Sequence, residues 1–331
     1  MFLGHALLAF ALATLIADWR GWPARRALTL GLVAGAFAAI PDVDVAYAAV
    51  AIDVGALNAA AVTQPSTLWD ATRDVHRTMT HSLIVALLAG PAFGLWAVKR
   101  TGSPLTRAAG RGVSAIALAA LVGAAYLVSG PLGGVVMGMF AAAGVGVATL
   151  CRITTDFPAR TVALAATAGL LSHPWGDLVT GAPPRLFYPF DVGVFDGRVL
   201  LHGDPTMHLL GAFAIELAVV WLAAVTIARV AGFSLPELVD LRALAGVAYG
   251  VPAVSMAPPT LEVSYHFVFS ILSVGVISAG VSTRPTAIPS ATELRRQFGR
   301  HPLLLSVAFT ALTGITAALV GYAVVYLVVA A

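Results

Sequence analysis

Residues 74–83, DVHRTMTHSL, bring two histidines, an arginine and an aspartate to the beginning of an apolar run. Further histidines and carboxylates stand at His5, in PDVD at 41–44, in SHPWGD at 172–177 and in HGDPTMH at 202–208. Imidazole with carboxylate and no thiolate is the ligand set of a hydrolytic Zn²⁺ or Mn²⁺ centre. The chain has one cysteine, so it can form neither an intramolecular disulfide nor a Cys-based zinc site.

The spacing of these residues predicts how several of them are presented. His173 and Asp177 are four residues apart, as are Asp204 and His208, which predicts that each pair shares one helix face. In PDVD, the proline and the alternating aspartates predict a broken helix end with both carboxylates turned the same way.

The stretch from His76 to Ser82 reads as a loop that leads into a helix. His76 and His81 are five apart and match one helix face poorly, so we place His76 in the loop and His81 in the first helical turn. Thr78 or Thr80 is the expected N-cap, and Thr80 and Ser82 are expected to orient or cap.

The elements that carry these residues are expected to be membrane helices. Hydrophobic residues make up 59% of the 331, charged residues only 11%, and mean hydropathy is +0.90. An ordinary soluble domain has about 25% charged residues. The composition indicates an all-α polytopic protein of the cytoplasmic (plasma) membrane. The 19 basic residues are scattered, which argues against nucleic acid as a partner.

Apolar runs of about 17–25 residues can cross a bilayer as helices. The chain offers about ten, near 2–17, 27–47, 81–98, 112–129, 131–150, 161–180, 207–228, 243–257, 264–282 and 303–330. The run at 243–257 is short and interrupted by Pro252, and GPLGG at 130–134 predicts a tight turn between two spans. We expect a metal-site bundle over 1–230 and additional helices over 231–331, without a separate soluble domain.

The Lys and Arg residues predict the orientation of these spans. If the loop after the first span is cytoplasmic, fifteen of the nineteen basic residues fall inside, and only Arg73, Arg77, Arg185 and Arg198 fall outside. Both termini are then extracytoplasmic. The six histidines of these motifs reach the outer face from four different spans, and Asp42 and Asp44 reach it from a fifth, although neither histidine nor aspartate played a part in setting the orientation.

Four blocks, in order, resemble the membrane-bound metal-dependent hydrolase family often called YdjM-like. They are GH at 4–5, PDVD at 41–44, HRTMTHS at 76–82, and LLSHPWGDLVTG at 170–181 followed by RLFYPF. The resemblance covers roughly residues 1–215. It implies these metal-site residues: His5, Asp42, Asp44, His76, His81, His173 and Asp177. Thr78 stands in place of the usual Gly and Val45 in place of a further His, for which His202 and His208 are candidate replacements.

These observations predict a hydrolase with one or two divalent ions, most readily Zn with Mn or Fe as alternatives. The ligands are expected to be chiefly His81, His173, Asp42 and Asp177, with His208 a further candidate. Asp44 or Asp204 is the expected general base, and Arg77 could steady a developing negative charge or simply lie at the membrane interface. A lipid-linked or other membrane-resident phosphoester suits this location.

Two other classes of function remain open. Charges within a membrane also mark ion paths, but an ion or solute transporter is expected to carry them at mid-membrane and in paired repeats. A metal-stabilised structural protein would use the same ligands in a closed site. An intramembrane zinc protease is disfavoured because the chain has no H-E-x-x-H sequence.

Overall fold

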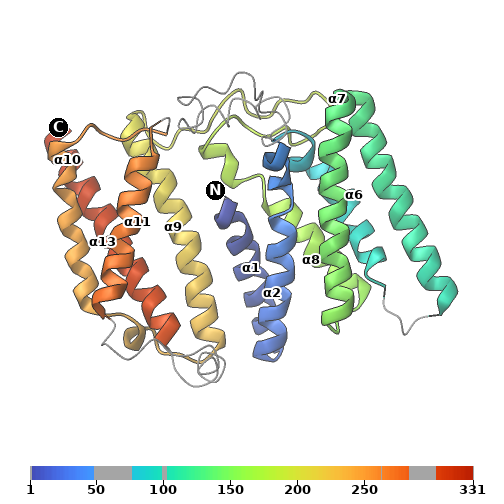
Figure 1. Ribbon diagram of the computed structural model, residues 1–331, viewed down its shortest axis with the longest axis horizontal. Helices are drawn as coiled ribbons and strands as arrows, with labels where there is room; N and C mark the ends of the chain where they lie inside the picture. Colours follow the sequence, from blue (N-terminus) through green and yellow to red (C-terminus); the bar gives the residue numbers. More distant parts are fainter. Residues whose placement is uncertain (1, 48–76, 99–102, 262, 283–302, 331) are drawn as a thin grey trace. The chain divides into compact units, whose positions relative to one another are not determined.

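The computed structural model describes residues 2–47, 77–98, 103–261, 263–282 and 303–330, and this part of the chain contains helices and no strand. Figure 1 shows the helices in chain order. They form two compact units, residues 1–199 and 200–331. Each unit is described separately below.

The described residues of unit 1 form five α-helices and three short 3₁₀ segments. The α-helices are α1 (Phe2–Trp19), α2 (Ala24–Ala38), α6 (Leu83–Trp96), α7 (Pro104–Thr154) and α8 (Ala159–Ser172), and the 3₁₀ segments are η1 (Pro41–Tyr47), η2 (Met79–His81) and η3 (Gly176–Val179). Helix α1 packs on α2, α2 on α8, and α6 on both α7 and α8. Every 3₁₀ segment therefore lies next to the end of a packed helix.

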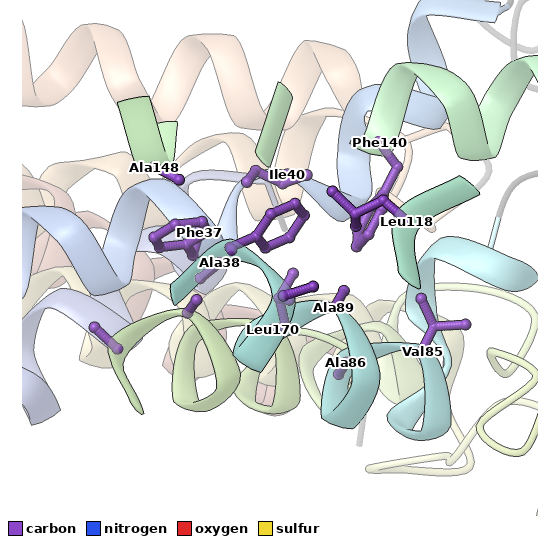
Figure 2. Close-up of a cluster of buried hydrophobic side chains, with 14 of the residues drawn as sticks. Phe37, Ala38, Ile40, Val85, Ala86, Ala89, Leu118, Phe140, Ala148 and Leu170 are labelled. Atoms are coloured by element: carbon purple, nitrogen blue, oxygen red, sulfur yellow. The ribbon is translucent and has the colours of Figure 1, made fainter. Parts of the chain in front are cut away.

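Aromatic rings and alanines fill the centre of unit 1. Phe93 packs against Phe37, with ring centroids 5.6 Å apart, and against Phe140 at 6.0 Å. Figure 2 shows Phe37 and Phe140 among small residues such as Ala38 and Ala89. Between membrane helices, lipid tails are as apolar as leucine, so close van der Waals packing rather than water exclusion holds the helices together.

Glycines allow α6 and α8 to approach closely. A Cβ atom on Gly94 would lie 2.8 Å from both the Ala159 oxygen and the Ala163 Cα, and one on Gly90 would lie 2.7 Å from the Thr167 Cα. Real Cβ contacts are not that short, so any larger residue would separate the two helices. This contact fixes the spacing between the segments that precede α6 and follow α8.

Helix α7 consists of two spans joined by a sharp turn. At Gly130 the backbone leaves the helical region, with φ 71° and ψ −168°, and Pro131 follows. Glycine tolerates a positive φ that a side chain would oppose. The turn predicted from GPLGG is thus confirmed.

Unit 2 contains α9 (Pro205–Val230), α10 (Pro252–Ser255), α11 (Tyr265–Ser282) and α13 (Leu303–Ala330), with 3₁₀ segments η4 (Leu235–Leu238) and η5 (Leu241–Gly250). Helix α13 packs against α9, α11 and η5. The core includes Ile271 and the ring of Phe267, whose centroid lies 5.2 Å from that of Tyr322.

The helices match the expected apolar runs in position but differ in two details. Helix α2 ends at Ala38, where the sequence predicted a span to residue 47, because the chain changes to the 3₁₀ segment η1 at Pro41. The run at 243–257 is mostly 3₁₀. Among the described residues, four segments are long and apolar enough to cross a membrane: 24–45, 104–154, 205–230 and 304–329. Four more helices are apolar but shorter.

Candidate metal centre

The ends of four helices of unit 1 bring histidine and carboxylate side chains together. His5 lies in the first turn of α1, Asp42 and Asp44 in η1 just after α2, His81 in η2 just before α6, and His173 and Asp177 just after α8. Because these helices pack antiparallel or across one another, the start of α1 and α6 meets the end of α2 and α8. All of these side chains except that of Asp42 are buried.

Two imidazole nitrogens face each other at the centre of the cluster. Nε2 of His81 lies 3.0 Å from Nε2 of His173. Oδ2 of Asp177 lies 3.1 Å from the first nitrogen, and Oδ1 of Asp42 lies 3.5 Å from the second. Two sets of three residues each offer ligand atoms within 4.8 Å of one another: His81, His173 and Asp177, and His5, Asp42 and His173.

The opposite nitrogen of His173 fixes which of its nitrogens carries the proton. Nδ1 lies 2.6 Å from the carbonyl oxygen of Ala38, which can only accept a hydrogen bond. His173 therefore donates Nδ1–H, and in the neutral ring Nε2 presents a lone pair to the centre of the cluster. A carbonyl partner of this kind is typical behind a metal-ligating histidine.

Thr80 fixes the proton of His81 in the same way. The Thr80 hydroxyl donates to Oδ2 of Asp44 at 2.8 Å, so its oxygen is left to accept from Nδ1 of His81, 2.9 Å away. In the neutral ring, Nε2 of His81 then also carries a lone pair.

The centre of the cluster is consequently rich in lone pairs and poor in protons. Oδ2 of Asp177 and Oδ2 of Asp42 are buried and accept no hydrogen bond from the described residues. Lone pairs on two nitrogens 3.0 Å apart repel each other unless a cation or a proton lies between them. The donor set of imidazole nitrogen and carboxylate oxygen therefore fits a divalent metal such as Zn²⁺, Mn²⁺ or Fe²⁺.

Arg77 holds Asp177 in place. One terminal nitrogen donates to Oδ1 of Asp177 at 3.0 Å and to the hydroxyl of Thr180 at 3.3 Å. The other donates to the backbone oxygens of Asp177 and Ala182, each at 3.2 Å. The backbone of Arg77 adopts a φ of 62°, and its N–H donates to Asp44. The guanidinium of Arg77 therefore serves to position Asp177 and the backbone around it.

Oδ1 of Asp177 has a second neighbour besides Arg77. Nε2 of His5 lies 3.3 Å from Oδ1, the oxygen that Arg77 contacts. Oδ1 is thus occupied by donors, and Oδ2 remains for a ligand role.

Asp42 and Asp44 contact opposite sides of one ring. Oδ1 of Asp42 lies 4.0 Å from Nε2 of His81, whereas Oδ2 of Asp44 lies 3.5 Å from Nδ1. The broken helix end predicted from PDVD is confirmed, but the two carboxylates do not share one role. Asp42 lies with the candidate ligands, and Asp44 lies behind His81.

Ser82, rather than Thr78 or Thr80, caps the helix that follows. Its hydroxyl accepts from the N–H groups of Ile84 and Val85, so α6 begins at Leu83 and His81 precedes it. The N-cap prediction at Thr78 or Thr80 was wrong, whereas the expected orienting role of Thr80 and the expected capping role of Ser82 are confirmed. Hydropathy places the start of an apolar run but does not distinguish neighbouring hydroxyl residues as caps.

The remaining proposed site residues are outside the described part of unit 1 or belong to unit 2. His76 is outside the described residues. Asp204 and His208 belong to unit 2, where Asp204 caps α9 by accepting from the Met207 N–H and also accepts from the Tyr326 hydroxyl at 3.0 Å. His208 accepts the N–H of Leu201 at Nδ1. His202 is exposed and accepts from the Asp204 N–H.

The fold and the cluster define an all-helical membrane protein with a buried His/Asp centre that could hold a metal. The sequence model of the YdjM inner membrane protein family matches residues 1–251, so the chain belongs to that family. The match extends beyond the roughly 215 residues in which the motifs were recognised. No curated protein and no solved structure matches the chain.

Proposed function

We propose that the protein is a membrane-embedded, metal-dependent hydrolase with its centre at the extracytoplasmic face. The observation that carries this proposal is the approach of the Nε2 atoms of His81 and His173 to 3.0 Å, beside two carboxylate oxygens that accept no hydrogen bond from the described residues. Such a convergence of buried acceptors is costly unless a cation neutralises it.

The proposed orientation rests on the basic residues. Within unit 1, Arg25 and Arg26 begin α2 and Arg160 begins α8, whereas the cluster lies at the other ends of these helices. Lys and Arg favour the cytoplasmic side. We therefore place the cluster outside, within a multi-pass protein of the cytoplasmic membrane that has about ten spans and both termini extracytoplasmic.

We assign the metal chiefly to His81, His173, Asp42 and Asp177, with Zn²⁺ as the leading candidate. His5 contributes to the second set of close ligand atoms, which leaves room for a second ion. When bound, such a metal lowers the pKa of a water molecule and stabilises negative charge on a phosphoryl oxygen.

The other residues of the cluster position the ligands or accept a proton. Thr80 and Asp44 hold His81 in its ligating tautomer, and Arg77 holds Asp177. Asp44 is fully buried and accepts from Thr80 and from the Arg77 N–H, so we now assign it to positioning rather than to proton transfer. Oδ1 of Asp42 faces His173 Nε2, and Oδ2, which accepts no hydrogen bond from the described residues, is our candidate for accepting a proton from water.

The proposed substrate is a membrane-resident phosphoester, such as a lipid phosphate. The location of the cluster among membrane helices suits a substrate that is itself held by the bilayer. The test is phosphate release from lipid phosphomonoesters and diphosphate esters by the purified protein in nanodiscs supplied with Zn²⁺ or Mn²⁺. We expect release by the wild type, loss in His173→Ala, and full activity in His266→Ala, which alters an exposed histidine of unit 2.

A second candidate is a structural metal site. The burial of His5, His81, His173 and Asp177 favours it, because a closed centre has no place for a substrate. In that case metal removal would lower the melting temperature while no phosphoester or other ester is cleaved. A transporter lacks a comparable supporting observation among the described residues.

A further inference from the structure

Two helices that carry the cluster, α6 and α8, are too short to cross a bilayer. Each has 14 residues. At 1.5 Å per residue, a 14-residue helix is about 21 Å long, against about 30 Å of hydrocarbon. Each helix therefore ends about 9 Å short of one of the two membrane boundaries. Side chains at the helix ends indicate which boundary each helix reaches.

Interfacial side chains mark the cytoplasmic ends of α2 and α8. The guanidinium of Arg26 lies 4.5 Å from the centre of the Trp22 ring and 5.9 Å from that of Phe157, just before α8. Tryptophan and arginine are typical of the boundary between lipid and water. Because this end is held at the boundary, the missing length falls at the end where the cluster lies.

Residues 183–199 are attached to that end by hydrogen bonds. The Leu83 N–H donates to the Leu186 oxygen at 2.9 Å, and the Ser82 hydroxyl to the Tyr188 oxygen at 2.8 Å. The Val199 N–H donates to the Leu178 oxygen at 2.8 Å. The side chains of Leu186 and Tyr188 are buried in unit 1.

The same segment turns apolar side chains outward. Phe190 is 63% exposed, Val192 56% and Val194 53%, and Phe187 between the two buried residues is also exposed. A group of this kind on an irregular segment marks a surface that meets an apolar partner. The position of the segment, at the end of membrane helices that stop about 9 Å below the boundary, identifies the lipid as that partner.

We propose that the exposed apolar side chains of residues 183–199 insert into the headgroup–acyl boundary of the leaflet on the side of the cluster, while the polar side chains of this segment stay at the headgroups. Apolar side chains at this boundary reach about 5–10 Å into the membrane, which matches the missing helix length. Arg185 is exposed on the same segment and can stay at the headgroups. The further consequence, that a lipid-borne substrate reaches the centre from within this leaflet, rests on the proposed function, whereas the insertion itself does not.

Site-directed spin labelling tests the insertion directly. The chain's only cysteine, Cys151, is buried, so Cys151→Ala gives a background for single labels. Labels at Phe190→Cys and Val194→Cys are compared with Ile116→Cys, on the exposed apolar face of α7, and with Asp196→Cys, a polar position of the same segment. The protein is reconstituted in vesicles of phosphatidylethanolamine and phosphatidylglycerol.

Collision with oxygen, which concentrates in lipid, is compared with collision with water-soluble Ni-EDDA. We expect Phe190 and Val194 labels to show the oxygen-to-nickel ratio of Ile116, and the Asp196 label a lower ratio. If Phe190 and Val194 instead match Asp196, the bilayer thins around unit 1 and the inference is overturned. The metal content of the Phe190→Asp variant is measured as well, and we expect it to equal that of the wild type. An unchanged metal content shows that a failure of insertion is separate from a failure of the metal site.

Discussion

At the scale of single residues, Thr80 decides which nitrogen of His81 faces the other candidate ligands. Its hydroxyl donates one hydrogen bond to Asp44 and accepts another from His81. The carbonyl of Ala38 has the same effect on His173. Partners behind a metal ligand commonly change metal affinity by about 10- to 100-fold when they are removed.

Thr80→Val removes this hydroxyl while keeping the shape of the side chain. We expect metal affinity to fall by about 10- to 100-fold, because His81 loses its fixed tautomer and Asp44 loses a donor. Competition with a chelator of known affinity measures the change. Thr80→Ser restores the hydroxyl and should restore affinity, and equal affinity in all three proteins would show that the hydroxyl has no such role.

Arg77→Lys distinguishes positioning from substrate binding. The guanidinium contacts Asp177, Thr180 and the oxygen of Ala182 together, which a lysine cannot reproduce. We therefore expect metal affinity to fall by about tenfold, in the range for such partners. Arg185→Lys, at an exposed position, is the matched control. Unchanged metal affinity with a raised KM for a phosphoester would instead assign Arg77 to the substrate.

At the scale of elements, the contact between α6 and α8 sets the distance between His81 and His173. Gly94→Ala would place a methyl group within 2.8 Å of the Ala159 oxygen, so the helices must separate. We expect a loss of stability of about 1–3 kcal/mol together with weaker metal binding. Thermal unfolding in detergent and metal titration measure the two effects.

The control for this change is Gly112→Ala in α7, because no atom lies within 4 Å of a Cβ added there. It should leave both stability and metal binding close to those of the wild type. If Gly94→Ala is equally harmless, the close approach of α6 and α8 does not fix the geometry of the centre.

The sequence predicted the elements better than their internal conformation. Apolar runs and the Gly130–Pro131 break place the helices, because hydropathy measures membrane depth directly. The break after α2 was predicted from PDVD, but the 3₁₀ conformation of η1 was not, since Val43, Val45 and Ala46 continue the apolar run regardless of backbone geometry. The role of the Ala38 carbonyl was also beyond a sequence pattern, because every residue has one.

At the scale of the whole molecule, the distribution of arginine and lysine predicts that both termini are extracytoplasmic. Alkaline phosphatase, which is active only outside the cytoplasm, should be active when fused to the C-terminus. Green fluorescent protein exported unfolded to that side should be dark. The opposite pattern would place the C-terminus in the cytoplasm and contradict a ten-span arrangement.

The candidate ligands illustrate how far a sequence can predict a site. His5, Asp42, His81, His173 and Asp177 share one face in the sequence-based topology, and the structure brings them together in unit 1. Asp204 and His208 had the same spacing as His173 and Asp177, but within unit 2 Asp204 accepts from Met207 and Tyr326, and His208 accepts from Leu201. A spacing of four residues between Asp and His therefore does not distinguish a helix cap from a metal ligand.

The central claim is that this cluster holds a metal, and the most direct measurement is metal content by mass spectrometry of the detergent-purified protein. The comparison is wild type against His81→Ala/His173→Ala, with His266→Ala as a control and circular dichroism to establish folding. We predict near-stoichiometric Zn, Mn or Fe in the wild type and the control, and its loss in the folded double variant. A wild type that binds none of these metals even after supplementation would contradict the account, and the cluster would then be a polar network joining the helix ends.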